Sequence, residues 1–380
     1  MRHPAGVIMV LMLAAITFRQ WSAAETTSPD PAAAVMDILG GGDTAGYARA
    51  LAPRPFSFPA DYGPHDDFRQ EWWYYTGNLD TAEGRHFGYE LTFFRFALAP
   101  HEAERDSAWA TRQIYLAHFA LTDVHANRYL NEERIDRAAL GLAGAQSSPY
   151  KVWLETWSAQ SGSSQGLPMH LHAATSRMAI DLDLNSLKPV VLQGDKGLSQ
   201  KGGEPGDASY YYSLTRLSTR GTVRVDGKSY PVSGLSWMDR EWSTSALERG
   251  QAGWDWFALQ LSDKRELMFY RLRRKDGSMD PHSRGTLVEA DGGTQPLPSQ
   301  AVSVVATEYW QSPHSGVRYP VAWKLNVPSL GISLDITPYI RDQEFNHRLR
   351  YWEGAVRVAG RDDDHSVKGN GYVELVGYAE

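Results

Sequence analysis

The stretch GLSWMDREWSTSALERGQAGWDWFALQLSDKRELMFYRLR, from Gly234 to Arg273, determines how the rest of the chain is interpreted. Four tryptophans and three acids crowd into its first part: Trp237, Trp242, Trp254, Trp256, Asp239, Glu241 and Asp255. Surface strands rarely carry so many indoles, and a core cannot bury unpaired carboxylates. The stretch therefore predicts either a functional site or a buried ion cluster.

The second half of this stretch repeats an earlier part of the chain. When Trp72 is aligned with Trp254, EWWYYTGNL (71–79) matches GWDWFALQL (253–261), and ELTFFR (90–95) matches ELMFYR (266–271). Each copy is rich in aromatic residues and contains a polar turn, which is typical of an antiparallel hairpin. Two related β domains are therefore expected, each introduced by an aromatic hairpin.

Short strand-like segments separated by Gly- and Ser-rich turns fill most of the remaining chain. We therefore predict an all-β protein with few short helices. The expected organisation is a signal peptide at 1–24, an N-terminal linker or arm on a domain surface at 25–66, and β domains at 67–233 and 234–380.

The first 24 residues resemble a secretory signal peptide. Arg2 and His3 precede an apolar run from Val7 to Phe18, and small residues suited to cleavage end at Ala24. The apolar run is too short for a comfortable transmembrane span. We therefore expect a periplasmic or secreted protein with no integral membrane segment after signal removal.

Composition narrows the possible partners. The 380 residues contain no cysteine, which excludes disulfides, a thiolate nucleophile and cysteine-ligated zinc. A net charge of −7 with interspersed signs argues against nucleic-acid binding, so an apolar small-molecule ligand is expected. Neither a GxSxG elbow nor a convincing phosphate loop is present, and the pair His170 and His172 has no obvious third ligand, so we expect neither a cofactor nor a metal.

Seven segments in order resemble the secreted AttH-like family, which is related to carotenoid 1,2-hydratases (hydroxyneurosporene synthases). They are EWWYYTGNL, FGYELTFFR, HFALTD, YYYSLTRL, SWMDREW, GWDWFALQL and EGAVRVAG…GNGYVELVGY, within Pro55 to Glu380. The resemblance implies two tandem lipocalin-like (calycin) antiparallel β-barrel domains. For the hydratase branch it implies addition of water to a terminal isoprenoid double bond, and fungal relatives of similar build act as hydratases or pericyclase-type enzymes on apolar polyenes.

One feature of the hydratase branch has no counterpart in this chain. That branch carries a histidine near the segment matching SWMDREW, where this chain has Met238 to Glu241. Many bacterial members of the family lie beside transporter-like genes and have no established activity. The resemblance therefore implies the fold more directly than it implies the reaction.

The acids of the central stretch are candidates for alkene hydration, which needs an acid, a face that stabilises a cation, and a water held by a base. Strand alternation places Trp237, Asp239 and Glu241 on one side of their strand, and Asp255 on one side of the next strand together with apolar residues. Burial among indoles would raise a carboxyl pKa and keep it protonated. We therefore assign Asp239 as general acid and Asp255 or Glu241 as the base, with Trp254 or Trp256 stabilising the cation.

A structural interpretation of the same residues competes with this one. Asp239, Arg240 and Glu241 would then form a buried salt-bridge cluster, closed by Arg271 or Arg95. Residues expected to line a ligand cavity are Glu71, Trp73, Tyr75, His118, Trp237, Trp242, Trp254 and Trp256. Among them, the aromatic hairpin residues could instead be barrel-floor packing, and His118 a hydrogen-bonded core histidine.

Two functions follow from these alternatives. The first is a secreted lipocalin-like protein acting on an apolar isoprenoid- or polyketide-like ligand as a cofactor-free hydratase, a lyase that adds water to a C=C bond. The second is a non-catalytic lipid-binding accessory protein associated with an envelope transporter. A barrel with an acidic, aromatic mouth suits either function.

Overall fold

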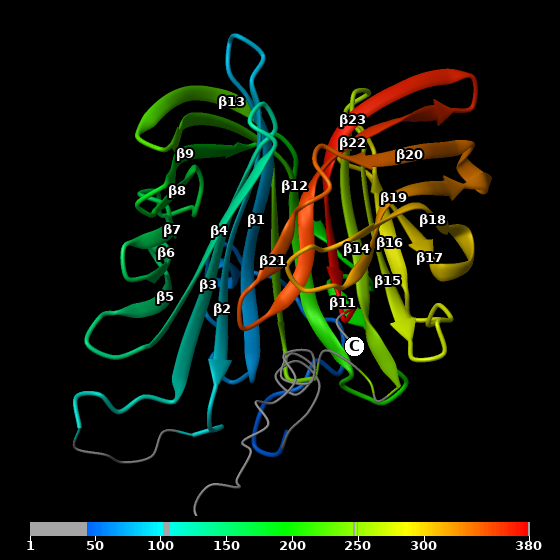
Figure 1. Ribbon diagram of the computed structural model, residues 1–380. Helices are drawn as coiled ribbons and strands as arrows, with labels where there is room; N and C mark the ends of the chain where they lie inside the picture. The colour runs from blue at the N-terminus through cyan, green and yellow to red at the C-terminus, as the bar shows by residue number, and fades with distance from the viewer. Residues whose placement is uncertain (1–43, 102–106, 246–247, 249, 379–380) are drawn as a thin grey trace, which may run out of the picture.

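The computed structural model describes residues 44–101, 107–245, 248 and 250–378, so the expected signal peptide lies outside the described residues. Two curled antiparallel sheets stand side by side, one a nearly closed barrel and the other a half-barrel (Figure 1). The described helices are three short 3-10 turns: η1 (Ala60–Tyr62), η2 (Ser299–Ala301) and η3 (Pro328–Leu330). The prediction of an all-β chain with two tandem antiparallel domains and few short helices is confirmed.

The first sheet has the strand order β4-β3-β2-β1-β13-β12-β9-β8-β7-β6-β5, and β10 and β11 also pair with β12. Its strands are β1 (Gln70–Asp80), β2 (His86–Ala97), β3 (Gln113–Asp123), β4 (Arg128–Arg137), β5 (Ala143–Ser147), β6 (Tyr150–Leu154), β7 (Trp157–Gln160), β8 (Met169–Ala174), β9 (Met178–Ser186), β10 (Val191–Leu192), β11 (Leu198–Gln200), β12 (Ala208–Val225) and β13 (Lys228–Ser243).

The second sheet has the order β17-β16-β15-β14-β23-β22-β20-β19-β18, and β21 also pairs with β22. Its strands are β14 (Gln251–Leu261), β15 (Glu266–Arg274), β16 (Arg284–Val288), β17 (Thr294–Pro298), β18 (Ser303–Gln311), β19 (Arg318–Val327), β20 (Ile332–Pro338), β21 (Glu344–Asn346), β22 (Arg350–Asp362) and β23 (His365–Val376). In each sheet the opening strand pairs with the last one, β1 with β13 and β14 with β23.

The change from one sheet to the other comes later than Gly234. Strand β13 runs through this residue and pairs on one side with β1 and on the other with β12 as far as Ser243. Because both neighbours belong to the first sheet, the segment SWMDREW is part of that sheet, and the second sheet begins at Gln251.

The two aromatic hairpins occupy matching places in their sheets, but their registers differ by two residues. Thr76 lies opposite Glu90 in the first hairpin, whereas Gln260, rather than the aligned Ala258, lies opposite Glu266 in the second. Because side chains alternate between faces with a period of two, this shift leaves every residue on its expected face.

Strands at the junction are buried on both faces. One face of β13 contributes Met238 and Trp242 to the core of the first barrel, and the other contributes Trp237 to a separate core between the sheets. The same division holds for β14, where Phe257 faces the second sheet's own core and Trp256 the shared core. Two-sided burial explains why these strands are aromatic throughout instead of alternating with polar residues.

The N-terminal segment before β1 enters the first barrel and does not simply lie on its surface. Tyr62 is 2% exposed within the core of this barrel, and its carbonyl accepts a hydrogen bond from Trp73 Nε1 at 2.8 Å. Phe56 and Phe58 pack against the same core. Among the described residues, no helix has the length and apolar character to cross a bilayer.

Candidate active site between the two sheets

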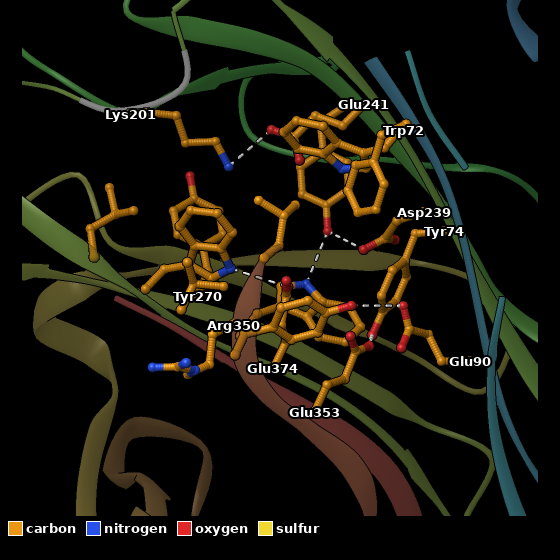
Figure 2. A pocket seen from close by; sticks show the side chains of 18 of the residues that line it. Trp72, Tyr74, Glu90, Lys201, Asp239, Glu241, Tyr270, Arg350, Glu353 and Glu374 are labelled. Carbon is orange, nitrogen blue, oxygen red and sulfur yellow. Dashed lines mark hydrogen bonds and ion pairs between the residues drawn. The ribbon is translucent and has the colours of Figure 1, made fainter. Parts of the chain in front are cut away.

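A cavity of about 100 Å³ lies where the two sheets face each other. Figure 2 shows its side chains projecting from strands of both sheets. Its lining is mainly aromatic and includes five carboxyls and two cations: Trp72, Tyr74, Glu90, Phe94, Phe96, Lys201, Tyr211, Asp239, Glu241, Trp254, Trp256, Tyr270, Leu272, Leu349, Arg350, Tyr351, Glu353, Glu374 and Val376.

Asp239 reaches the pocket from β13, as alternation with Trp237 and Glu241 predicts. Its carboxyl accepts hydrogen bonds from three donors: Tyr211 Oη, Ser213 Oγ and Trp237 Nε1, the last at 2.7 Å. Burial nevertheless outweighs these bonds and raises the pKa of Asp239 to about 7. Its protonation state therefore changes near neutral pH.

A second acidic group joins the two sheets. Glu90 of β2 and Glu353 of β22 are neighbouring carboxyls of the pocket lining, and Tyr351 Oη donates to Glu90 and Tyr74 Oη to Glu353. Burial raises the pKa of Glu90 to about 7, and burial together with the neighbouring Glu90 carboxyl raises the pKa of Glu353 further. Two carboxyls in contact cannot both ionise at low cost, so the pair retains a proton near neutral pH.

The two remaining carboxyls of the pocket are Glu374 of β23 and Glu241 of β13. Burial raises the pKa of Glu374 to about 8, and nearby acids add to the shift. Within the described chain its side chain has one hydrogen bond, from Trp254 Nε1 at 3.1 Å. Glu241 instead accepts from Ser209 Oγ and forms an ion pair with Lys201 Nζ at 3.2 Å.

Asp255 does not belong to this pocket. Because side chains alternate along β14, Asp255 lies on the same face as Phe257 and Leu259, which is directed toward the interior of the second sheet. There its Oδ1 accepts from Arg273 Nε at 2.9 Å and from Tyr378 Oη at 2.8 Å. The structure therefore does not bring Asp255 and Asp239 together, because Asp239 faces the pocket from the first sheet and Asp255 points to the interior of the second.

The expected ion cluster is also divided between two faces. Arg240 points into the first barrel, away from Asp239 and Glu241, and with Arg95 it binds the carboxylate of Glu71. All three of these charged side chains are completely buried. Although burial acts to raise it, the pKa of Glu71 lies well below its usual value because of the two guanidinium groups.

The residues predicted to line a ligand cavity are also divided between the pocket and the core of the first barrel. Trp254 and Trp256 line the pocket between the sheets, and Trp237 supports it through its bond to Asp239. Four others face the core of the first barrel: Glu71, Trp73, Tyr75 and Trp242.

His118 lies behind the pocket wall. Its Nδ1 is 2.6 Å from Tyr351 Oη and its Nε2 is 3.3 Å from Glu133 Oε2. Burial lowers the pKa of His118, which favours the neutral imidazole. It therefore orients a pocket tyrosine and has no direct place in the cavity lining.

Several pocket residues escaped the sequence analysis, above all Glu90, Glu353 and Glu374. The signal that drew attention to Asp239, a carboxyl among apolar residues of a strand, was present at each of them. They lie far apart in the chain, and only the packing of the two sheets against each other brings them together.

Two clusters outside the pocket contain histidine and carboxylate side chains of the types that bind metals. His170 and His172 each contact Asp181 on the exposed face of β8 and β9, and His170 also contacts Asp183. Ligand atoms of Glu248, Asp280 and His282 lie within 4.8 Å of one another. Arg274 Nε already donates to Asp280 at 3.0 Å, which reduces the capacity of this group to bind a cation.

Comparison with known proteins agrees with this architecture. The sequence model of the AttH-like family matches residues 49–378. The chain belongs to the AttH-like family. A crystal structure described as AttH from Nitrosomonas europaea is 34% identical to this AttH-like protein, with a TM-score of 0.78, covering 87% of this chain and 99% of that one. The lipocalin-like fold implied by the sequence resemblance is thus confirmed.

Similarity also extends to a hydratase. Kievitone hydratase from Fusarium solani subsp. phaseoli is 24% identical over 213 residues, which cover 54% of the AttH-like chain and 59% of that relative. The crystal structure of kievitone hydratase from Nectria haematococca has a TM-score of 0.66 at 17% identity, covering 87% of this chain and 96% of that one. The latter likeness shows a shared fold.

Proposed function

We propose that this AttH-like protein binds an apolar isoprenoid- or polyketide-like molecule between its two sheets and adds water to a C=C bond without a cofactor. The observation that carries the proposal is a set of buried carboxyls that hold protons near neutral pH inside an aromatic pocket. The similarity to kievitone hydratase supports the same class of reaction.

The hydrogen bonds suggest which carboxyl gives the proton and which receives one. Asp239 accepts from three donors, an environment that suits a carboxylate and hence a base. Glu374 has a pKa of about 8 and a single donor, so it is protonated at neutral pH and suits the acid. This reverses the role that the sequence assigned to Asp239.

In the proposed reaction, Glu374 transfers its proton to one alkene carbon and the π electrons form the new C–H bond. The positive charge left on the other carbon faces the indole rings of Trp254 and Trp256. A water molecule forms the C–O bond with that carbon and loses a proton to Asp239. Solvent then returns a proton to Glu374 and accepts one from Asp239, so the net change is addition of H and OH.

We also propose export of the protein to the periplasm or the exterior, whereas association with an envelope transporter belongs to the alternative, non-catalytic function. Its support is the signal-like sequence of residues 1–24. Expression of the full chain in a Gram-negative host, followed by N-terminal sequencing of the periplasmic fraction, tests it. A mature protein that begins after Ala24 is expected, and an uncleaved cytoplasmic protein would contradict it.

Hydration is tested with acyclic terpenoids and prenylated phenols in water enriched in the heavy oxygen isotope. Mass spectrometry should detect a product heavier by one labelled water. Glu374→Gln and Asp239→Asn should each lower turnover by about a hundredfold or more, the range for loss of a general acid or base. The control is Asp335→Asn, because Asp335 is exposed, pairs with Lys324 and lies outside the pocket lining.

Turnover by either variant at the wild-type rate would contradict the assigned roles. Tight binding of these compounds without any labelled product would favour the non-catalytic carrier instead.

A further inference from the structure

The pocket between the sheets is electrically polarised. Figure 2 shows Lys201 and Arg350 on one side of the pocket, and Asp239, Glu90 and Glu353 on the other. The walls between these ends are aromatic. A ligand that spans the pocket would therefore meet cations at one end and carboxyls at the other.

Arg350 has no acidic partner in the described part of the chain. Its Nε donates to Asn346 Oδ1 at 2.8 Å, and no described carboxylate oxygen lies within 4.0 Å of its guanidinium nitrogens. Glu344, on the neighbouring strand β21, forms no ion pair with Arg350 within 4.0 Å, and its carboxylate instead accepts from three hydroxyls, those of Ser312, Ser315 and Tyr319.

The other pocket cation is already balanced. Lys201 Nζ forms its ion pair with Glu241 and lies 3.8 Å from the ring centre of Tyr270. The remaining carboxyls retain protons, since burial raises the pKa of Asp239 to about 7 and that of Glu374 to about 8. Arg350 is thus the lining cation that has no ion-pair partner among the described residues.

We propose that Arg350 selects ligands with one ionised acidic group, so that the ligand of this pocket is an anionic amphiphile. The planar guanidinium can donate two parallel hydrogen bonds to a carboxylate or an equivalent anion. The apolar body then extends along the aromatic walls toward Asp239 and Glu374. This inference rests on the proposed apolar-ligand function and adds the ligand's charge and orientation.

The probe is cis-parinaric acid, a conjugated polyene carboxylic acid whose fluorescence reports an apolar environment. Its binding affinity is compared with that of its neutral methyl ester. Titrations use the whole protein near pH 6.5, below the pKa of about 7 of Asp239. The wild type should bind the acid about tenfold or more tightly than the ester, as one charge-assisted pair allows. Added salt should narrow the difference only slightly if the pair is shielded from solvent.

Arg350→Gln should weaken acid binding until the two probes bind about equally, with ester affinity unchanged. Arg348→Gln is the matched control, because Arg348 is two residues away, 65% exposed and outside the pocket lining. This variant should keep the wild-type preference. Equal wild-type affinity for acid and ester, or equal loss of both in Arg350→Gln, would overturn the inference.

Turnover separates this inference from the proposed hydratase function. Preference for the acid without hydration of any compound supports the ligand class and contradicts the enzyme. Hydration of neutral esters as efficiently as of acids supports the enzyme and contradicts the role of Arg350. Failure of both probes to bind would overturn the ligand class.

Discussion

The carboxyls of Glu90 in the first sheet and Glu353 in the second are neighbours in the pocket at the junction of the two sheets, and the charge of Glu90 raises the pKa of Glu353 in addition to burial. Glu90 Oε2 is buried and has no hydrogen-bond partner among the described residues, so a proton shared with the neighbouring Glu353 carboxyl would satisfy it. One proton thus helps to hold the sheets together and also belongs to the pocket. Protonation of the site and contact between the domains are therefore linked.

Stability should fall as pH rises from about 5 to 8. The pKa values of Glu90, Asp239 and Glu374 are raised by burial to about 7, 7 and 8, so the folded protein binds more protons than the unfolded chain in this window. Each group that stays protonated only in the fold contributes up to about 1.4 kcal/mol per pH unit. Thermal unfolding followed by circular dichroism at a series of pH values measures the slope.

Glu374→Gln should flatten this pH dependence, since glutamine does not ionise. Glu83→Gln, at an exposed turn residue, is the control and should leave the slope as in the wild type. A wild-type melting temperature that rises steadily between about pH 5 and 8 would contradict the sign of the linkage.

Glu71→Gln should destabilise the first barrel without altering the pocket directly. Among the described residues, Glu71 provides the only carboxylate that contacts both buried guanidinium groups, Arg95 and Arg240, and the change removes it. Loss of one partner of a buried pair costs about 3–5 kcal/mol. Urea unfolding measures the loss, and a change no larger than that of the exposed-pair variant Asp335→Asn would show that other contacts hold these arginines.

Asp255→Asn should separate stability from activity. The change weakens the bonds to Arg273 and Tyr378 inside the second sheet and should cost about 2 kcal/mol of unfolding free energy. Ligand binding and turnover in the folded fraction should stay at wild-type levels because Asp255 is outside the pocket lining. Loss of turnover equal to that of Asp239→Asn would place Asp255 back in the mechanism.

Much of the fold could be predicted from the hairpin repeat. The match of Trp72 with Trp254 located the opening strands of both sheets, since a repeated aromatic hairpin marks a repeated domain. The exact sheet boundary could not be predicted, because the hydrophobic pattern of β13 continues through Gly234 and only its pairing with β1 assigns it to the first sheet.

The site was only half predictable for a similar reason. Alternation correctly placed Asp239 and Glu241 on one face, but it cannot say whether a face meets the barrel interior or the other sheet. Asp255 was therefore assigned a catalytic role like Asp239, and Glu71 a place in the cavity lining, although each is held by arginines in the interior of its own sheet. Glu353 and Glu374 were missed because their importance comes from contacts between strands distant in the chain.

Tyr211→Phe should raise the apparent pKa of Asp239. The Tyr211 hydroxyl donates to the Asp239 carboxylate and so opposes the effect of burial on its pKa. Removing the donor destabilises the ionised form of Asp239. If Asp239 is the base, the rising limb of the pH–rate profile should therefore move above about pH 7 by roughly one unit. One unit is about the contribution of one hydrogen bond to a charged group.

Tyr212→Phe provides the matched comparison, because the adjacent residue points into the first barrel and donates to the Asp61 carbonyl at 3.1 Å. It should leave the profile in place even if stability falls, since the hydroxyl does not contact Asp239. If Tyr211→Phe instead lowered turnover equally at every pH, the Tyr211 hydroxyl would have to act on the ligand itself. Asp239 would then lose its place as the titrating base, and the proton acceptor would have to be sought at Glu241.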